Sequence, residues 1–397
     1  SLAALGAGPP PVIPPRADAA AVAAPLDAVT APDAEFRRRW NLDPRHARMV
    51  LVEGFPILGS AAVPDAAFRE AAHVIRRMVQ GRPELLEPIV AARIRLVLMD
   101  HDEVTTDVPE HADLEPAAYW DRRARGLGAT TVRPAVSCGV ENLLSYPGDP
   151  YDGESILVHE FAHVIHQFGM AGLDPDFDRR LEQAYQAAMV AGRWVGTYAS
   201  TNRHEYFAEG VQSFFDTNRS DDSEHGPVDT RAELAEHDPA LLRLLEEVLG
   251  ENPWRYRPVI ERLDEPHLAG FDPSAAPRFA WSPEVLAAWE AHRREQRATP
   301  TRLTLTAAGP ASPPPASTAA GAAGRLRFVN RRAESLRLVW VDTLGQFREY
   351  GWVRAAGEHE QPTYAGHTWM LLDAENRPVA WVIAAAGPGV VEIPAGP

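Results

Sequence analysis

The sequence of 397 residues has no lysine, a single cysteine and no long apolar run. The one cysteine, Cys138, excludes an internal disulfide framework and a zinc site built from thiolates. A membrane-spanning helix would need an apolar run of about 18 residues, and the N-terminus has no secretory-signal pattern of charged, apolar and small residues. We therefore expect a globular protein of two or three domains without a membrane span.

The sequence has fewer basic residues than acidic ones. All 39 are arginine, against 55 acidic residues, so the net charge is −16 at pH 7. A negative protein repels the phosphate backbone of nucleic acids, and no basic patch with interleaved aromatic residues offsets this charge. We therefore expect no nucleic-acid partner. The use of arginine alone, with abundant Ala, Pro and Gly, indicates a GC-rich bacterial genome.

Composition divides the chain into four stretches. Residues 1–32 are rich in Ala and Pro and predict a tail, and residues 298–324 are rich in Pro, Ala and Gly and predict a linker. Residues 33–297 between them predict a domain of helices and strands. Residues 325–397 contain short alternating runs typical of a small antiparallel β-sandwich, to which residues 301–306 could add a strand. The fold class is therefore α+β, with a C-terminal all-β domain.

Periodicity locates several elements within residues 33–297. Helical spacing of apolar residues predicts helices over 65–81, 175–193 and 239–249. Alternation predicts a strand in "RIRLVLM" from Arg93 and a second in "ATTVRPAV" from Ala129.

The stretch "LVHEFAHVIHQFG", from Leu157 to Gly169, contains the pattern H-E-x-x-H. On a helix its apolar residues lie on one face, and His159 and His163 lie on the opposite face. Two imidazoles four residues apart can bind one Zn²⁺ at about 2.0–2.1 Å, and Glu160 can then reach water beside the metal. The alternative is a solvated helix with surface histidines. A third ligand decides between them.

A third ligand is available in "YASTNRHEYFAEGVQSFF". Glu205 and Glu209 share one helical face, so one carboxylate would bind the metal while the other accepts a hydrogen bond from a ligating histidine. Glu205 has a local alternative as the capping-box residue of a helix that begins after Asn202. That alternative explains neither Glu209 nor Tyr198.

The order "HEFAH" followed by "Y-x6-EYFAE" resembles the gluzincin peptidases, the group that includes the catalytic domain of anthrax lethal factor. The resemblance covers residues 155–215 and implies a zincin-like metallopeptidase domain over residues 33–297 with one Zn²⁺ per chain. Carried over to this sequence, it implies the metal ligands His159, His163 and Glu205, the general base Glu160, the oxyanion donor Tyr198, and Glu209 as the residue that orients His159.

A second set of residues lies near the C-terminus, in "FVNRRAESLRLVWVDTLGQFREYGWVRAAGEHEQPTYAGHTWMLLD". Its aromatic and hydrogen-bonding members are Trp340, Tyr350, Thr363, Tyr364, His367 and Trp369. An ordinary sandwich core, which commonly buries Trp and Tyr, would also explain them.

This stretch resembles the β domain of the von Hippel-Lindau tumour suppressor, with Asn330, Trp340, Tyr350, "TYAGHTW" and Asp373 in the family's order. The resemblance implies that the six residues form a pocket for 4-hydroxyproline, in which Thr363 and His367 meet the hydroxyl. Thr363 replaces the serine usual in that family. The sequence has no helical segment after the sandwich, so we expect no recruitment of a ubiquitin ligase.

Together these features predict a bacterial zinc endopeptidase, secreted or periplasmic, whose sandwich recognises hydroxyproline-containing proteins such as collagen-like or plant wall proteins. One alternative keeps the peptidase but makes the sandwich a general docking or autoinhibitory module. Another is a non-catalytic protein that binds hydroxyproline peptides. The presence of Glu160 and Tyr198 argues against the second, because a structural zinc site needs neither a base nor an oxyanion donor.

Overall fold

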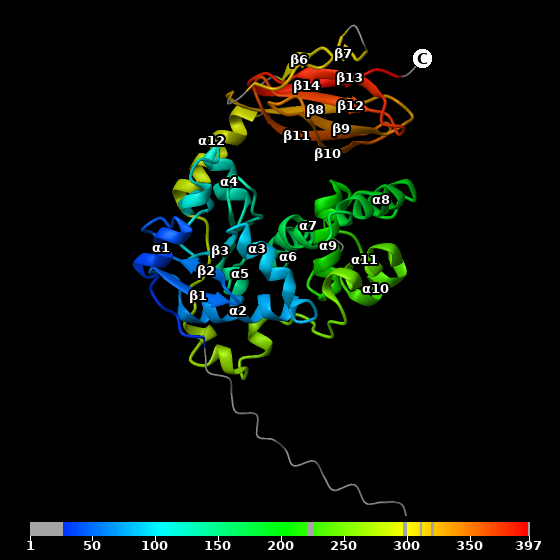
Figure 1. Ribbon diagram of the computed structural model, residues 1–397. Helices are drawn as coiled ribbons and strands as arrows, with labels where there is room; N and C mark the ends of the chain where they lie inside the picture. Colours follow the sequence, from blue (N-terminus) through cyan, green and yellow to red (C-terminus); the bar gives the residue numbers. More distant parts are fainter. Residues whose placement is uncertain are drawn as a thin grey trace, which may run out of the picture.

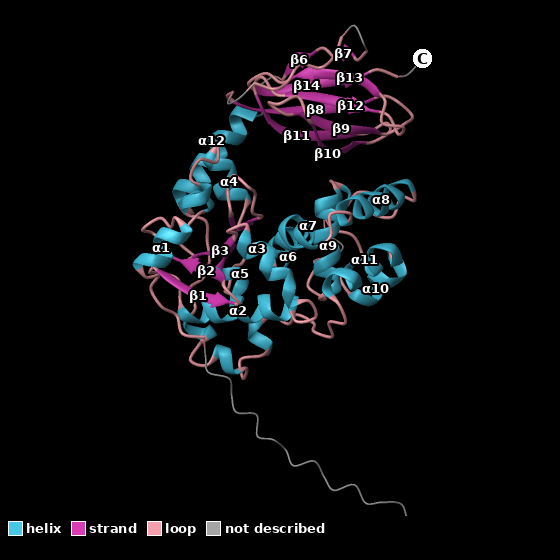
Figure 2. Ribbon diagram, in the orientation of Figure 1, coloured by secondary structure: helices cyan, strands magenta, loops and turns pink. Residues whose placement is uncertain are grey.

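The computed structural model describes residues 27–220, 222, 225–296, 300–309, 312–318 and 321–395. Helices dominate the first part of the chain and strands the last part (Figure 2). Most of the predicted tail, residues 1–26, lies outside the described residues. Its described end packs on the N-terminal domain, since Asp27 accepts a 2.6 Å hydrogen bond from Arg76 and Thr30 bridges to Met49.

A five-stranded mixed sheet forms one side of the N-terminal domain. Its order is β1 (Arg48–Val52), β2 (Phe55–Gly59), β3 (Arg95–Met99), β5 (Ala135–Gly139) and β4 (Gly126–Leu127). The pairs β2–β3 and β3–β5 are parallel, while β1 and β4 run antiparallel at the two edges. The strand predicted from Arg93 is confirmed as β3. The strand predicted from Ala129 is wrong in its bounds, because β5 begins only at Ala135, after Pro134 has ended the loop.

Helices pack against this sheet and against one another (Figure 1). The helices are α1 (Ala34–Trp40), α2 (Asp65–Val79), α3 (Leu86–Ala91), α4 (Ala117–Arg123), α5 (Val140–Leu143), α6 (Ile156–Val164), α7 (Ala171–Leu173), α8 (Phe177–Val190), α9 (Arg203–Phe214), α10 (Arg231–His237), α11 (Pro239–Leu249) and α12 (Pro283–Gln296). The helices predicted over 65–81, 175–193 and 239–249 are confirmed as α2, α8 and α11. Fully buried Phe68, Phe161, Phe207 and Leu245 join α2, α6, α9 and α11 in one core.

A buried ion pair fastens the chain after α11 to α2. Glu70 on α2 accepts hydrogen bonds from Arg262, at 3.0 Å, and from His267, at 2.7 Å. Glu70 is fully buried and Arg262 is 3% exposed. Burial alone would raise the pKa of the Glu70 carboxyl, but the hydrogen bonds from His267 and Arg262 hold that pKa below its ordinary value.

Replacement of this carboxylate is therefore expected to be strongly destabilising. Glu70→Gln leaves the buried Arg262 charge with only the partly exposed Glu265, at 3.5 Å, as a counter-ion, which should lower the free energy of unfolding by about 3 kcal/mol at pH 7. Because the folded-state pKa is depressed, this stabilisation is present above about pH 4.3 and is lost as the pH falls further. Urea titrations at pH 7 and pH 3.5 measure both effects. The control Glu84→Gln removes an exposed carboxylate beside Arg82 and should change the stability by less than about 0.5 kcal/mol.

The C-terminal domain is a sandwich of two sheets. Its strands are β6 (Thr301–Leu303), β7 (Thr306–Ala307), β8 (Ala323–Asn330), β9 (Leu336–Val341), β10 (Phe347–Val353), β11 (Glu358–Tyr364), β12 (Thr368–Leu372), β13 (Pro378–Ile383) and β14 (Gly387–Ile393). One sheet has the order β10-β9-β12-β13-β7 and the other β11-β8-β14-β6. Leu326, Phe328, Leu338 and Trp369 are buried between them.

Two predictions for this region need correction. The sandwich is not wholly antiparallel, because β14 runs parallel to both of its neighbours, β8 and β6. Residues 298–324 are not simply a linker, because they contribute β6, β7 and the first residues of β8 to the two sheets. Ser317 is buried and accepts a 2.8 Å hydrogen bond from the Thr368 amide of β12. Alternating "RLTLT" was the signal that revealed β6 in this Pro- and Ala-rich context.

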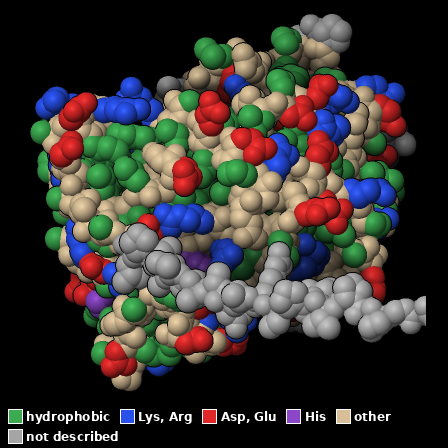
Figure 3. Space-filling model, turned by 60° about the horizontal axis from the view of Figure 1, so that its bottom comes forward, with side chains coloured by type: hydrophobic (Ala, Val, Ile, Leu, Met, Phe, Trp, Pro, Cys, Tyr) green, Lys and Arg blue, Asp and Glu red, His purple; other side chains and the backbone are tan. Residues whose placement is uncertain are grey.

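The surface mixes charges of both signs. On the face drawn in Figure 3, acidic and arginine side chains alternate among the described residues without a broad area of one sign. In the part of the chain that the structure describes, no helix combines the length and the apolar character required to cross a membrane.

Candidate metal centre and peptide pocket

Helix α6 presents its two faces as the spacing predicts. Ser155 begins the helix, and its side-chain oxygen accepts a hydrogen bond from the Val158 amide at 3.3 Å. Phe161 on the apolar face is fully buried against the core. His159 and His163 lie on the other face, where they are 8% and 7% exposed, and His159 borders a cavity.

The three predicted ligands converge. The Nε2 atoms of His159 and His163 are 3.3 Å apart, and Oε2 of Glu205 lies 3.2 Å from the first and 3.3 Å from the second. Two ligands held about 2.0–2.1 Å from a tetrahedral zinc ion would be about 3.3 Å apart. Two imidazole nitrogens and one carboxylate oxygen in this arrangement therefore fit a zinc ion.

Glu205 reaches this position from the first turn of α9. Asn202 caps the helix, and its side-chain oxygen accepts hydrogen bonds from the amides of His204 and Glu205. The Glu205 carboxylate is not used in a capping box and points to the histidines of α6. Desolvation by burial opposes its charge, but the neighbouring charges and hydrogen bonds of His163 and His159 hold the pKa of Glu205 well below its ordinary value.

The residue closest to Nδ1 of His159, the ring nitrogen that does not face the other ligands, was not predicted. Glu209 Oε1, the expected partner, lies 3.5 Å from His159 Nδ1, whereas Gln212 Oε1 lies at 2.7 Å. Gln212 is fully buried, and Asn218 donates a 3.1 Å hydrogen bond to Glu209. The spacing of 205, 209 and 212 is the signal that could have found Gln212, because residues four and seven positions apart share a helical face.

Glu160 and Tyr198 border the same cavity as His159, with a volume of about 520 Å³. Burial raises the pKa of the Glu160 carboxyl. The nearby charge of Glu205, and then burial, raise the pKa of the Tyr198 hydroxyl. Tyr198 comes from the short helix Tyr198–Ser200 that precedes α9, and its ring centroid is 6.1 Å from that of His159. A partly buried carboxyl group and a protonated phenol thus flank the three converging ligands.

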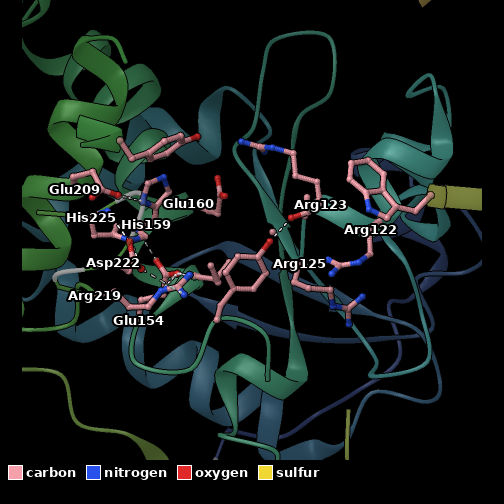
Figure 4. A pocket seen from close by; sticks show the side chains of 16 residues that line it. Arg122, Arg123, Arg125, Glu154, His159, Glu160, Glu209, Arg219, Asp222 and His225 are labelled. Atoms are coloured by element: carbon pink, nitrogen blue, oxygen red, sulfur yellow. Dashed lines mark hydrogen bonds and ion pairs between the residues drawn. The ribbon is translucent and has the colours of Figure 1, made fainter. Parts of the chain in front are cut away.

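Two further residues of this site were missed from the sequence. Arg123, at the end of α4, lies on the side of the cavity that faces Glu160 (Figure 4), and its positive charge acts to lower the pKa of the Tyr198 hydroxyl against the effects of Glu205 and burial. Gly126 in the edge strand β4 allows close packing, because an added Cβ would lie 2.3 Å from Ile156 and 3.2 Å from Glu160. Neither residue belongs to a recognisable motif, so only the tertiary structure shows their proximity.

The six predicted residues of the peptide pocket are also brought together. Tyr350 packs edge-on against Trp369 at 4.9 Å, and Trp340 and Tyr364 lie 5.1 Å and 5.3 Å from His367 between ring centroids. This arrangement forms one cluster across β9, β10, β11 and β12. Tyr350, Thr363 and Tyr364 border a second cavity of about 900 Å³.

Some polar groups of this cluster already form a hydrogen bond within the protein, and others are available to a ligand. Trp369 is 1% exposed, and its indole N–H donates a 2.7 Å hydrogen bond to the Thr363 hydroxyl oxygen. The hydroxyl proton of Thr363 therefore stays available to another acceptor. Burial lowers the pKa of His367, so its ring is neutral at pH 7 and has one nitrogen able to accept a hydrogen bond.

A family model described as the VHL beta domain matches residues 316–382. The match includes β8 to β12 and all six residues of the peptide pocket. No curated protein matches the chain. The C-terminal domain is thus similar to the von Hippel-Lindau β domain, which suggests recognition of a hydroxyproline-containing peptide. The match does not reach the residues of the converging histidines.

Proposed function

We propose that this protein is a zinc-dependent endopeptidase of the gluzincin type that acts on hydroxyproline-containing proteins. The observation that supports it most is the convergence of His159, His163 and Glu205 within 3.3 Å beside the acid Glu160. Such substrates are extracellular, so we propose that the protein is secreted or periplasmic.

Each residue has a defined part in hydrolysis. When bound, zinc acts as a Lewis acid that activates water and polarises the scissile carbonyl. Glu160 takes the proton from the attacking water and passes it to the leaving amine. Tyr198 donates a hydrogen bond to the oxygen on which negative charge develops, and Arg123 places a positive charge in the same cavity. Gln212 fixes the ring of His159 through Nδ1.

A second candidate function is a protein that binds hydroxyproline peptides without cleaving them. The observation in its favour is that the family match covers only the sandwich, at residues 316–382. A sandwich that serves as a general docking or autoinhibitory module is the third possibility. Metal content and hydrolysis separate these functions.

Zinc content is the direct test of the metal centre. We expect about one zinc per chain by atomic emission, and near-complete loss of it in His163→Ala and Glu205→Ala, since a catalytic zinc needs three protein ligands. The control is His204→Ala, which removes a histidine next to Glu205 whose ring contacts His166 rather than the converging atoms. Full zinc in Glu205→Ala would contradict the assignment of the third ligand.

A further inference from the structure

The two cavities adjoin each other across the domain boundary. Arg123, Tyr198 and Trp289 border both the cavity of about 520 Å³ beside Glu160 and the cavity of about 900 Å³ beside Tyr350. The side chain expected to contact the reacting carbonyl, Tyr198, therefore lies at the junction of the metal centre with the peptide pocket. In Figure 1 the C-terminal sandwich lies over α4, α8 and α9, the elements next to this junction.

The sandwich is held in a defined position by contacts around the junction. Arg354 donates a 2.7 Å hydrogen bond to the Ser200 hydroxyl, two residues after Tyr198. Tyr364 of the peptide pocket donates a 2.6 Å hydrogen bond to the carbonyl of Glu115, just before α4. Both contacts join the sandwich to the N-terminal domain, and Tyr364 and Glu115 also line the larger cavity.

Gly351 brings the backbones of the two domains close together. It lies at a β-bulge in β10 with φ of 127°, and an added Cβ would be 2.0 Å from the carbonyl oxygen of Thr201. Only glycine fits there without displacement of one backbone from the other. The sandwich thus rests directly on the segment Tyr198–Thr201.

An ion-pair network extends the same interface. Arg337 of β9 contacts Glu349 of β10 at 2.6 Å and Glu182 of α8 at 3.4 Å, and Arg203 of α9 lies 3.8 Å from Glu349. These side chains are at most 25% exposed, so solvent screens them less than surface pairs. The network connects the first turn of α9, which holds Glu205, to the strand that holds Tyr350.

The lining of the larger cavity suits a proline-rich chain. Its aromatic and proline residues come from both domains and include Pro116, Tyr119, Trp289, Tyr350, Pro362 and Tyr364. Aromatic grooves bind extended proline-rich segments, which lose little conformational entropy because they are already stiff. The occupant that this lining favours is therefore an extended peptide that contains proline and hydroxyproline.

We propose that a single extended peptide occupies both cavities, so that the sandwich sets the position of the cut at a fixed number of residues from a hydroxyproline. This inference rests on the proposed peptidase function. The sandwich then forms part of the substrate-binding cleft of the enzyme. Hydroxyproline in the pocket aligns the scissile bond with Glu160 and Tyr198.

The position of cleavage tests this inference in the zinc-loaded full chain. Peptides of one length and composition, in which a single hydroxyproline is moved one position at a time, should be cut at a site that moves with it. Mass spectrometry of the products identifies the bond. A cut that stays at one sequence position, or cuts scattered around the hydroxyproline, would overturn the inference while leaving the peptidase function intact.

Binding tests it independently of hydrolysis. In the full-length Glu160→Gln variant, a short hydroxyproline peptide extended at one end should bind at least about 10-fold more tightly than the short peptide, measured by calorimetry. Extension at the other end should add little. Equal affinities for the short peptide and both extended peptides would overturn the shared cleft, whether or not the native protein hydrolyses peptides.

The interface glycine provides a matched pair of variants, both made in the Glu160→Gln chain. Gly351→Ala should keep the affinity for the short peptide within about 3-fold of its value in the parent variant. It should lose most of the increase in affinity that the extended peptide shows over the short one. Gly345→Ala also places alanine at a positive φ, of 77°, but no atom lies within 4 Å of the added Cβ, so this variant should keep that gain. Arg354→Gln, which removes the bond to Ser200 without a clash, should reduce the gain as well. Full retention of the gain in both interface variants would contradict a cleft set by domain docking.

Discussion

Glu160→Gln is expected to lower kcat for peptide hydrolysis by roughly 100- to 10,000-fold while leaving the zinc content unchanged, because it removes a proton acceptor and no ligand. The amide is the same size as the carboxylate, so the cavity beside His159 keeps its shape. The variant should therefore bind substrate about as well as the native protein.

Product formation from a hydroxyproline peptide, followed by chromatography, gives kcat, and atomic emission gives the metal content. The control Glu87→Gln changes an exposed glutamate on α3 and should have the native kcat. Native turnover by Glu160→Gln would refute the role of Glu160. Absence of hydrolysis in the native zinc-loaded protein would instead favour the binding protein.

A preference for hydroxyproline over proline of up to about 10⁴ in affinity is the second large effect. The hydroxyl of the ligand can accept a hydrogen bond from Thr363, whose oxygen is already used by Trp369, and can donate one to the neutral ring of His367. Proline offers neither partner. The cost of burying those two polar groups unpaired is the source of the discrimination.

Calorimetry with paired peptides in the full-length Glu160→Gln variant measures this preference. His367→Ala should bring the two affinities within about 10-fold of each other, since one of the two hydrogen bonds is gone. Trp340→Phe removes contact area that both peptides share, so it should weaken both and preserve their ratio. Equal affinities in the parent chain would leave the sandwich as a general docking module.

The spacing of apolar residues along the chain was enough to predict several helices and strands. Periodicity of apolar residues predicts the helices α2, α8 and α11 and the strand β3. Alternation likewise predicts five strands of the sandwich. The strands β11 and β14 were missed because "EHEQPTY" and "GPGVVEI" contain proline or glycine, which obscure the alternation. Their pairing partners, rather than their own propensity, make them strands.

The residues of the site also divide into those that local spacing predicts and those that only the tertiary structure reveals. The spacing within α6 and α9 was enough to place His159, His163 and Glu205 on suitable helical faces, and the structure brings the two faces together. Arg123 could not be inferred, because its role depends on the tertiary packing that places the end of α4 beside the cavity. The contribution of the sandwich to the cleft was equally hidden, since it arises from contacts such as Gly351 on Thr201 between residues 150 positions apart.

The position of β14 has a consequence for biosynthesis. This last strand lies inside its sheet, between β8 and β6, and pairs parallel to both. Parallel pairing of strands far apart in sequence is slow, because a long loop must close before the contacts form. The sandwich can therefore complete its fold only after residues up to Ile393 have left the ribosome. The peptide cleft is then assembled last, when the N-terminal domain is already folded.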